Sequence, residues 1–317
     1  MRLFPCLFVA LLAAAGPLRG AEAYQAWHER TAMLLIAQRC KAMDKLEQAA
    51  LLSGQVQARG ALLRDGQDPG ELDAVQSDLM RRAEKISCQD PKVQNEIGKM
   101  HDAAQLWAHL VDMRYPGRWQ SWMARRDDAR DKARWRVRAP LQGPAGSALD
   151  FGLIAEGDQL FLALVAPASL APSRVTLRMR DPQKLAQPLA PDMLRLMQRS
   201  GDSPASLMPP ASVTQSFIAV QKRPAQASLT TAAGDKPIRA VVYRFSTAAL
   251  HAFSALDPRD VAALKLLYGD RTGISPGQQL VYIERADFNA ARLFAETTSG
   301  DLDQAPVAAE SAAGEHN

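Results

Sequence analysis

One change in hydrophobic period, near residue 136, limits the folds that this 317-residue chain can adopt. Before it, apolar residues recur at spacings of three and four, as in Leu72, Val75 and Leu79, which is typical of amphipathic helices. After it, apolar and polar residues alternate, which is typical of strands with one face in solvent. The pattern predicts an α+β chain, in which an N-terminal helical bundle at 24–136 precedes a predominantly antiparallel β module with a few packed helices at 137–296.

Helix start and stop signals divide the N-terminal part. Asp68-Pro69 and Asp90-Pro91 each place a capping residue before a proline at the first helical position, and Tyr115-Pro116-Gly117 is a stop signal. The expected helices cover residues 25–64, 69–87, 91–113 and 119–134.

Strand and helix signals also alternate in the C-terminal part. Strands are expected at 149–154, 160–165, 175–180, 216–221, 238–245 and 280–284, and helices at 192–199, 257–268 and 287–295. Asp257-Pro258 is a helix start signal and Gly269 a stop signal. A surface loop is expected at 201–214. Residues 297–317 hold four acidic residues and no Lys or Arg, so a disordered acidic tail is predicted.

The first 23 residues have the order of regions found in secretory signal peptides. Arg2 provides a positive start, residues 7–15 form a short apolar run, and Ala21-Glu22-Ala23 is a small-residue cleavage site. The apolar run is shorter than the ~20 residues of a membrane-spanning helix, so no transmembrane span is expected. We expect cleavage after Ala23 and export to a bacterial periplasm or beyond; a buried N-terminal helix is the alternative.

Export changes the interpretation of the cysteines, because cleavage removes Cys6 and leaves the even pair Cys40 and Cys88 in an oxidising compartment. If the helices at 25–64 and 69–87 pack antiparallel, the two cysteines lie about 9 Å apart along the helix axis, at ~1.5 Å per residue. The loop after residue 87 can close that gap. A Cys40–Cys88 disulfide is therefore predicted, with two free thiols as the alternative.

Catalytic and metal-binding motifs are absent from the sequence. It contains no G-x-S-x-G, S-x-x-K or H-E-x-x-H motif and no P-loop. The sequence has no C-x-x-C motif and no pair of His residues four positions apart on an expected helix, so it indicates no metal site. We therefore assign no catalytic residue, no metal ligand and no cofactor.

Positive charge is concentrated in one segment rather than spread over the chain. The net charge of +4 is too small to indicate a nucleic-acid partner, but residues 114–138 hold nine Lys or Arg against three Asp, with three Trp among them. Arg beside Trp can bind phosphate or carboxylate groups while stacking on sugar or apolar surfaces. The candidate ligand-binding residues are Arg118, Trp119, Trp122, Arg125 and Arg126. The alternative is a solvated helix held by Asp–Arg pairs, with its Trp residues packed against the second domain.

Residues 145–295 resemble the invasion-associated locus B type of periplasmic protein. The segments that carry the resemblance are 161–167, 175–181, 243–245, 248–253, 261–267 and 287–291. Two features depart from that family: there are no cysteines near residues 243–252, and the loop at 182–215 is extra. The resemblance implies a secreted, β-sandwich-like module that acts by binding, and it identifies no active site.

These observations together predict an exported, non-enzymatic binding or envelope-assembly protein. Its partner is expected to be an envelope component or another exported protein, not nucleic acid; the sequence does not indicate an oligomeric state. The alternatives are an envelope hydrolase without a recognisable motif and an interaction module of an exported protein complex.

Overall fold

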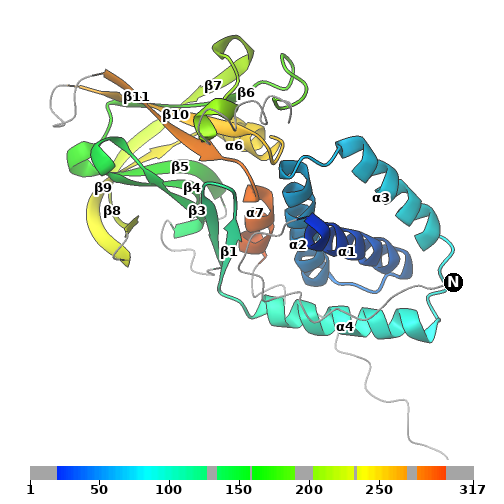
Figure 1. Cartoon of the computed structure of the whole chain (residues 1–317). Helices are drawn as coiled ribbons and strands as arrows, with labels where there is room; N and C mark the ends of the chain where they lie inside the picture. Colours follow the sequence, from blue (N-terminus) through cyan, green and yellow to red (C-terminus); the bar gives the residue numbers. More distant parts are fainter. Residues whose placement is uncertain are drawn as a thin grey trace, which may run out of the picture.

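The computed structural model describes residues 20–126, 134–157, 159–189, 203–231, 234–269 and 277–297, and in this part the chain is α+β. The helices are α1 (Gly20–Cys40), α2 (Lys45–Arg64), α3 (Pro69–Ala83), α4 (Pro91–Ala108), α6 (Thr247–Ser254) and α7 (Phe288–Glu296) (Figure 1). Within these residues, no helix combines the length and the apolar composition that crossing a bilayer requires.

The strands form two antiparallel sheets. The seven-stranded sheet has the order β1-β2-β3-β4-β5-β9-β8, and the four-stranded sheet has the order β11-β10-β6-β7. The strand bounds are β1 (Asp112–Pro116), β2 (Ser121–Arg125), β3 (Arg134–Gln142), β4 (Ala148–Glu156), β5 (Gln159–Pro167), β6 (Arg174–Arg180), β7 (Thr214–Ile218), β8 (Gln221–Thr231), β9 (Gly234–Arg244), β10 (Val261–Tyr268) and β11 (Gly277–Glu284).

One hydrophobic core lies between the two sheets. Alternate residues of each strand face it, so Phe151 of β4, Leu177 of β6 and Leu264 of β10 are fully buried in the same cluster. Two helices close this core. Phe253 of α6 and Phe288 of α7 pack edge to face there, with ring centroids 4.8 Å apart.

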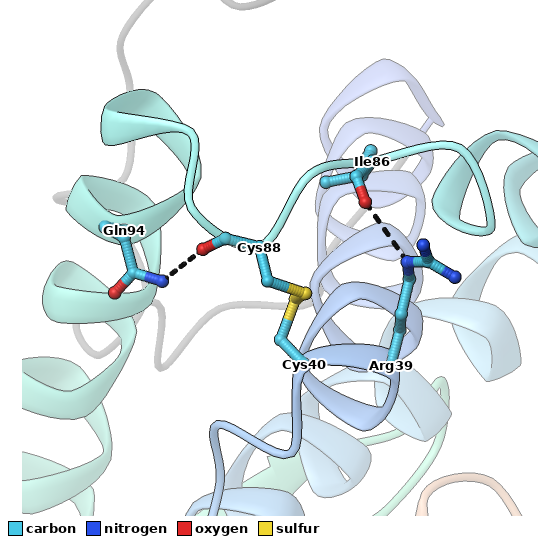
Figure 2. The surroundings of a disulfide bond; sticks show 5 residues. All are labelled: Arg39, Cys40, Ile86, Cys88 and Gln94. Atoms are coloured by element: carbon cyan, nitrogen blue, oxygen red, sulfur yellow. Dashed lines mark hydrogen bonds between the residues drawn. A yellow bond between two sulfur atoms is a disulfide. The ribbon is translucent and has the colours of Figure 1, made fainter.

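The first four helices lie beside the sheets and contact them mainly through α2, which packs against α7 (Figure 1). A disulfide between Cys40 and Cys88 joins the end of α1 to the loop between α3 and α4, with the two Cα atoms 5.6 Å apart. Figure 2 shows a second link beside it, in which Arg39 Nε donates to the Ile86 carbonyl at 3.1 Å. The predicted disulfide is confirmed.

The single helix expected at 25–64 is wrong, because two helices occupy this range. After Cys40 the chain turns at Lys41, whose φ is 51°, and the Ala42 N–H donates back to the Ala37 carbonyl at 3.0 Å. Asp44 and Glu47 then form a capping box that starts α2. This start signal is present in the sequence but lies inside an unbroken apolar pattern.

The helix expected at 119–134 is also wrong. β2 occupies Ser121–Arg125, with Trp122 and Ala124 buried and Met123 and Arg125 exposed. That alternation has the period of a strand, but it covers too few residues to stand out among the charges. Residues 127–133, which carry most of the expected ion pairs, lie outside the described residues.

The helix expected at 257–268 is replaced by β10, and the helix expected at 91–113 ends at Ala108. Asp257-Pro258 starts a turn, in which Asp260 Oδ2 accepts from the Asp257 N–H at 2.9 Å. β10 pairs with β6 and β11, so it lies inside the four-stranded sheet and is buried over Val261–Leu264. A strand buried on both faces has a continuous apolar sequence and cannot be told from a buried helix by period.

The other expected elements have mixed outcomes. Strands are present at five of the six expected places and the last expected helix is present, but the strand expected at 216–221 is divided between the end of β7 and the start of β8. The strands β1, β2 and β3, most of β8, and the helix α6 were not expected. The described part of the expected loop contains two short 3-10 turns, at Pro204–Leu207 and Ala211–Val213. Residues 1–19, the helix expected at 192–199 and the tail beyond residue 297 lie outside the described residues, while residues 20–23 of the expected signal form the first turn of α1.

Candidate functional site

The outer face of the seven-stranded sheet, opposite the core, forms a groove of about 590 Å³. The sheet curls enough that β8, at one end of the strand order, contacts β3 and β4. This volume is within the ~300–1,000 Å³ typical of small-molecule sites. Six arginines line this groove, which we call the arginine groove: Arg114, Arg125, Arg134, Arg136, Arg138 and Arg223.

Strand pairing places Arg114 and Arg138 on the same face. Arg114 of β1 lies opposite Met123 of β2, which lies opposite Arg138 of β3. Directly paired residues of antiparallel strands point to the same side of a sheet. The row continues through two small residues, Gly152 of β4 and Ala163 of β5, which leave space beneath the long arginine side chains.

A β-bulge in β3 changes which residues reach the groove. Trp135 pairs with Ile154 of β4, but the register shifts before Val137, which pairs with Leu153. Trp135 packs on the outer face and Val137 in the core, although strict alternation would put both on one face. The extra residue is Arg136. The bulge therefore adds an arginine and an indole ring to the groove.

Apolar residues form the floor of the groove: Ile154, Val165, Ala225, Ala227 and Val242, from β4, β5, β8 and β9. Ile154, Val165 and Val242 are buried in a small hydrophobic cluster on this outer face, separate from the main core. Trp135 packs against the same cluster. The groove thus combines cationic side chains with an apolar surface.

Three groove arginines have carboxylate partners. Arg125 Nε lies 3.6 Å from Asp112 Oδ1, Arg138 Nη1 lies 3.7 Å from Asp150 Oδ2, and Arg223 Nη1 lies 3.0 Å from Glu156 Oε1. In the described lining of the groove, six arginines lie with a single carboxylate, Asp112. Anions are therefore attracted to this face.

Arg136 carries a donor that the surrounding protein does not satisfy. Its Nη1 atom is buried and has no hydrogen-bond partner within the described part of the chain. Buried polar atoms without a partner are rare in native proteins, because each costs about 1–3 kcal/mol.

Of the five candidate residues from the sequence, Arg125 lines the groove and four lie elsewhere. Arg118 and Trp119 are in the turn between β1 and β2, where their backbone N–H groups donate to the Glu284 carboxylate at 2.9 Å each. The Arg118 guanidinium lies 4.9 Å from the centre of the Trp119 ring. This pair is held by the end of β11, away from the groove lining.

Trp122 is a core residue. Its side chain is fully buried, and its ring lies 5.0 Å from that of Phe288. The indole N–H donates to the carbonyls of Glu284 and Arg285 at 3.2 Å and 3.1 Å. This hydrogen bonding satisfies the one polar atom of the side chain, so the ring fixes β2 against α7 and β11.

Arg126 directly follows β2, and its side chain donates hydrogen bonds to the C-terminal ends of α4 and α7. Its guanidinium lies between the rings of Trp107 and Phe294, 4.0 Å and 3.9 Å from their centres. It donates to the carbonyls of Trp107 and Ala108 at 2.7 Å and 2.8 Å, and to the Phe294 carbonyl at 3.1 Å. Burial lowers the pKa of Arg126 to about 10, so the side chain is still charged at neutral pH.

The sequence marked the segment that supplies most of the groove but not the residues that form it. Arg114, Arg134, Arg136 and Arg138 all belong to the basic segment 114–138, and their charge surplus is the signal. Nothing local marks Arg223 or the floor residues, because they reach the groove only through strand pairing.

The groove lining contains groups for binding but not for acid–base chemistry. Its one carboxylate among the described residues is Asp112, which pairs with Arg125, and the lining has no His, Cys, Ser or Lys. Across the described ranges, no three His, Cys, Asp or Glu side chains lie close enough together to hold a metal ion. Comparisons with protein-family models, curated proteins and solved structures found no match.

Proposed function

We propose that this chain is an exported, non-enzymatic protein that binds an anionic component of the bacterial envelope in the arginine groove. The observation that carries the proposal is that six arginines line one groove. Arginine binds phosphate and carboxylate groups through two parallel N–H donors, so such a cluster favours a ligand with several anionic oxygens. The resemblance of residues 145–295 to a periplasmic family that acts by binding agrees with this.

We propose that the other parts of the chain support this binding role. The four N-terminal helices form a disulfide-linked bundle, and the sheets form the sandwich-like module that presents the groove. An envelope hydrolase is less well supported, because its reacting groups would need to meet in one cleft. Asp112 is the one carboxylate in the described lining, and His251 lies on α6, outside that lining.

Photocrosslinking in cells tests the proposed site. A photoreactive residue at Gln226, which lines the groove, is expected to capture an anionic lipid, an anionic glycan or an acidic exported protein, identified by mass spectrometry. A photoreactive residue at Met80, exposed on α3, is the positional control. The same captured molecules at both positions would contradict the groove as the site.

Charge removal provides the matched comparison. The double variant Arg136→Gln/Arg138→Gln is expected to lose the molecule captured at Gln226. Arg81→Gln/Arg82→Gln removes two charges from exposed side chains on α3 and is expected to leave capture unchanged. Capture that persists in the groove variant at the wild-type level would exclude these arginines from binding.

Export is the second part of the proposal, and the order of regions in residues 1–23 supports it. Cleavage after Ala23 would keep Trp27, a fully buried residue of α1, inside the mature chain. A periplasmic product whose N-terminal sequence begins at Tyr24 is expected. A product that begins at Met1 in the cytoplasm would contradict export.

A further inference from the structure

We infer that the ligand of the arginine groove is a single-chain phospholipid that ends in a phosphomonoester, with this phosphate at the arginines and its acyl chain along the apolar floor. The inference rests on the proposed function, because it names the class of anion that the groove takes. It rests on the presence of arginines and apolar residues in one groove of about 590 Å³.

The positive side of the groove fits a phosphate better than a single carboxylate. Arg136 is the extra residue of the bulge in β3, Arg138 follows the bulge, and Arg114 lies on the same face as Arg138, two strands away. A phosphomonoester offers three acceptor oxygens and up to two negative charges, so it can engage several guanidinium groups at once.

The floor points to an acyl chain. Ile154, Val165 and Val242 come from three neighbouring strands, and Ala225 and Ala227 come from β8, which folds across the sheet. Ile154, Val165 and Val242 are already buried by protein, so the apolar surface that a ligand would meet is mainly that of the half-buried Ala225, Ala227 and Trp135. A hydrocarbon chain gains from every methylene that it places there, because apolar burial is favourable in proportion to area.

Trp135 lies where the apolar floor of the groove meets the arginines. Its ring packs against the floor cluster, while its neighbours along β3, Arg134 and Arg136, line the groove beside it. Amphipathic aromatic rings of this kind stand where an apolar body meets a polar end group. A phospholipid whose chain follows the floor would pass this ring at the point where its phosphate reaches the arginines.

Alkyl phosphates below their micelle-forming concentrations test the inference on the unaltered full chain. Titration calorimetry is expected to rank dodecyl phosphate above octyl phosphate, and glycerol phosphate last. Each buried methylene contributes about 0.8 kcal/mol, or about fourfold in affinity, so a difference of at least tenfold between the two chains is expected. Dodecyl maltoside, which has the chain but no charge, is expected to bind at least tenfold more weakly than dodecyl phosphate.

Variants separate the two halves of the groove. Ala227→Leu, which fills part of the floor, is expected to reduce the chain-length dependence while glycerol phosphate binding persists. Arg136→Gln/Arg138→Gln is expected to weaken every phosphate probe by at least tenfold. An unchanged circular dichroism spectrum and an unchanged thermal unfolding temperature show that each variant is folded. The chain-length series uses the unaltered protein, so it does not depend on the folding of any variant.

The outcomes distinguish this inference from the function on which it rests. Equal affinity for glycerol phosphate, octyl phosphate and dodecyl phosphate would overturn the phospholipid and leave an anion-binding groove. Equal affinity for dodecyl maltoside and dodecyl phosphate would overturn the role of the arginines. If none of the phosphate probes binds and Gln226 captures nothing in cells, the inference and the proposed function both fail.

Discussion

Arg126 joins the ends of three elements through one side chain. It follows β2, donates to the carbonyls that end α4, and donates to Phe294 of α7. The last carbonyls of a helix have no partner within the helix, so a charged donor at that position is stabilising. The rings of Trp107 and Phe294 both pack against the guanidinium, with their centres 4.0 Å and 3.9 Å from it.

Replacing Arg126 tests this role. Arg126→Met keeps much of the side-chain volume but removes the charged donor from the carbonyls of Trp107, Ala108 and Phe294, so the free energy of unfolding is expected to fall by about 2–4 kcal/mol in urea denaturation. Arg125→Met changes the neighbouring arginine, whose side chain is 58% exposed, and is expected to shift it by less than about 0.5 kcal/mol. Equal stability of both variants would contradict the structural role of Arg126.

At the scale of elements, the disulfide fixes the geometry of the first four helices. It connects residues 48 apart in sequence and closes a loop that contains α2 and α3. The free energy that such a crosslink contributes increases with the length of the closed loop in the chain-entropy account. Elsewhere in the molecule the elements are held by packing and strand pairing instead.

Removal of both sulfur atoms tests this contribution. Cys40→Ala/Cys88→Ala is expected to lose about 2–4 kcal/mol of unfolding free energy, measured by urea denaturation followed by circular dichroism. The reduced wild-type protein is the matched control and is expected to show a similar loss. A variant as stable as the oxidised protein would show that the helices do not depend on the crosslink.

Elements also show where sequence patterns were ambiguous. The apolar run of β10 is as compatible with a helix as with a strand, and its position between β6 and β11 decides the outcome. β2 has the alternation of a strand, but only over five residues. In both cases pairing with strands distant in sequence outweighs the local preference, since propensity is a weak constraint on a buried segment.

At the scale of the whole molecule, an ion pair ties the helices to the sheets. Arg64 of α2 donates to Asp287, the residue before α7, at 2.7 Å, and the Asp287 side chain is 2% exposed. Burial alone would lower the pKa of Arg64, but Asp287 raises it, so the guanidinium stays charged. A buried charge of this kind depends on its partner.

Single and double variants measure that dependence. Asp287→Asn is expected to lower the unfolding free energy by about 3–5 kcal/mol, because it leaves the Arg64 charge buried without a counter-charge. Arg64→Met/Asp287→Leu removes both charges and is expected to cost clearly less than the single variant, although it removes more polar groups. Urea denaturation gives both values. A double variant less stable than the single one would show that the pair is worth more than apolar packing at this contact.

The sequence alone determined the features that depend on composition and short spacings. These are the α+β character, the Cys40–Cys88 disulfide and the basic segment that supplies most groove arginines. Each follows from residues that are close in sequence, or from the even pair of cysteines that remains when Cys6 is set aside. Local periodicity and charge carry that information directly.

Only the tertiary structure decided which of those residues form a site. The bulge at Arg136 changed the face on which Trp135 lies, and strand pairing brought Arg223 and the floor residues to the same groove. Trp122 is buried in the core and Arg126 packs on Trp107, so neither side chain lines the groove. The physical reason is that a side chain's face and its burial are set by the partners of its strand, and those partners lie far away in the sequence.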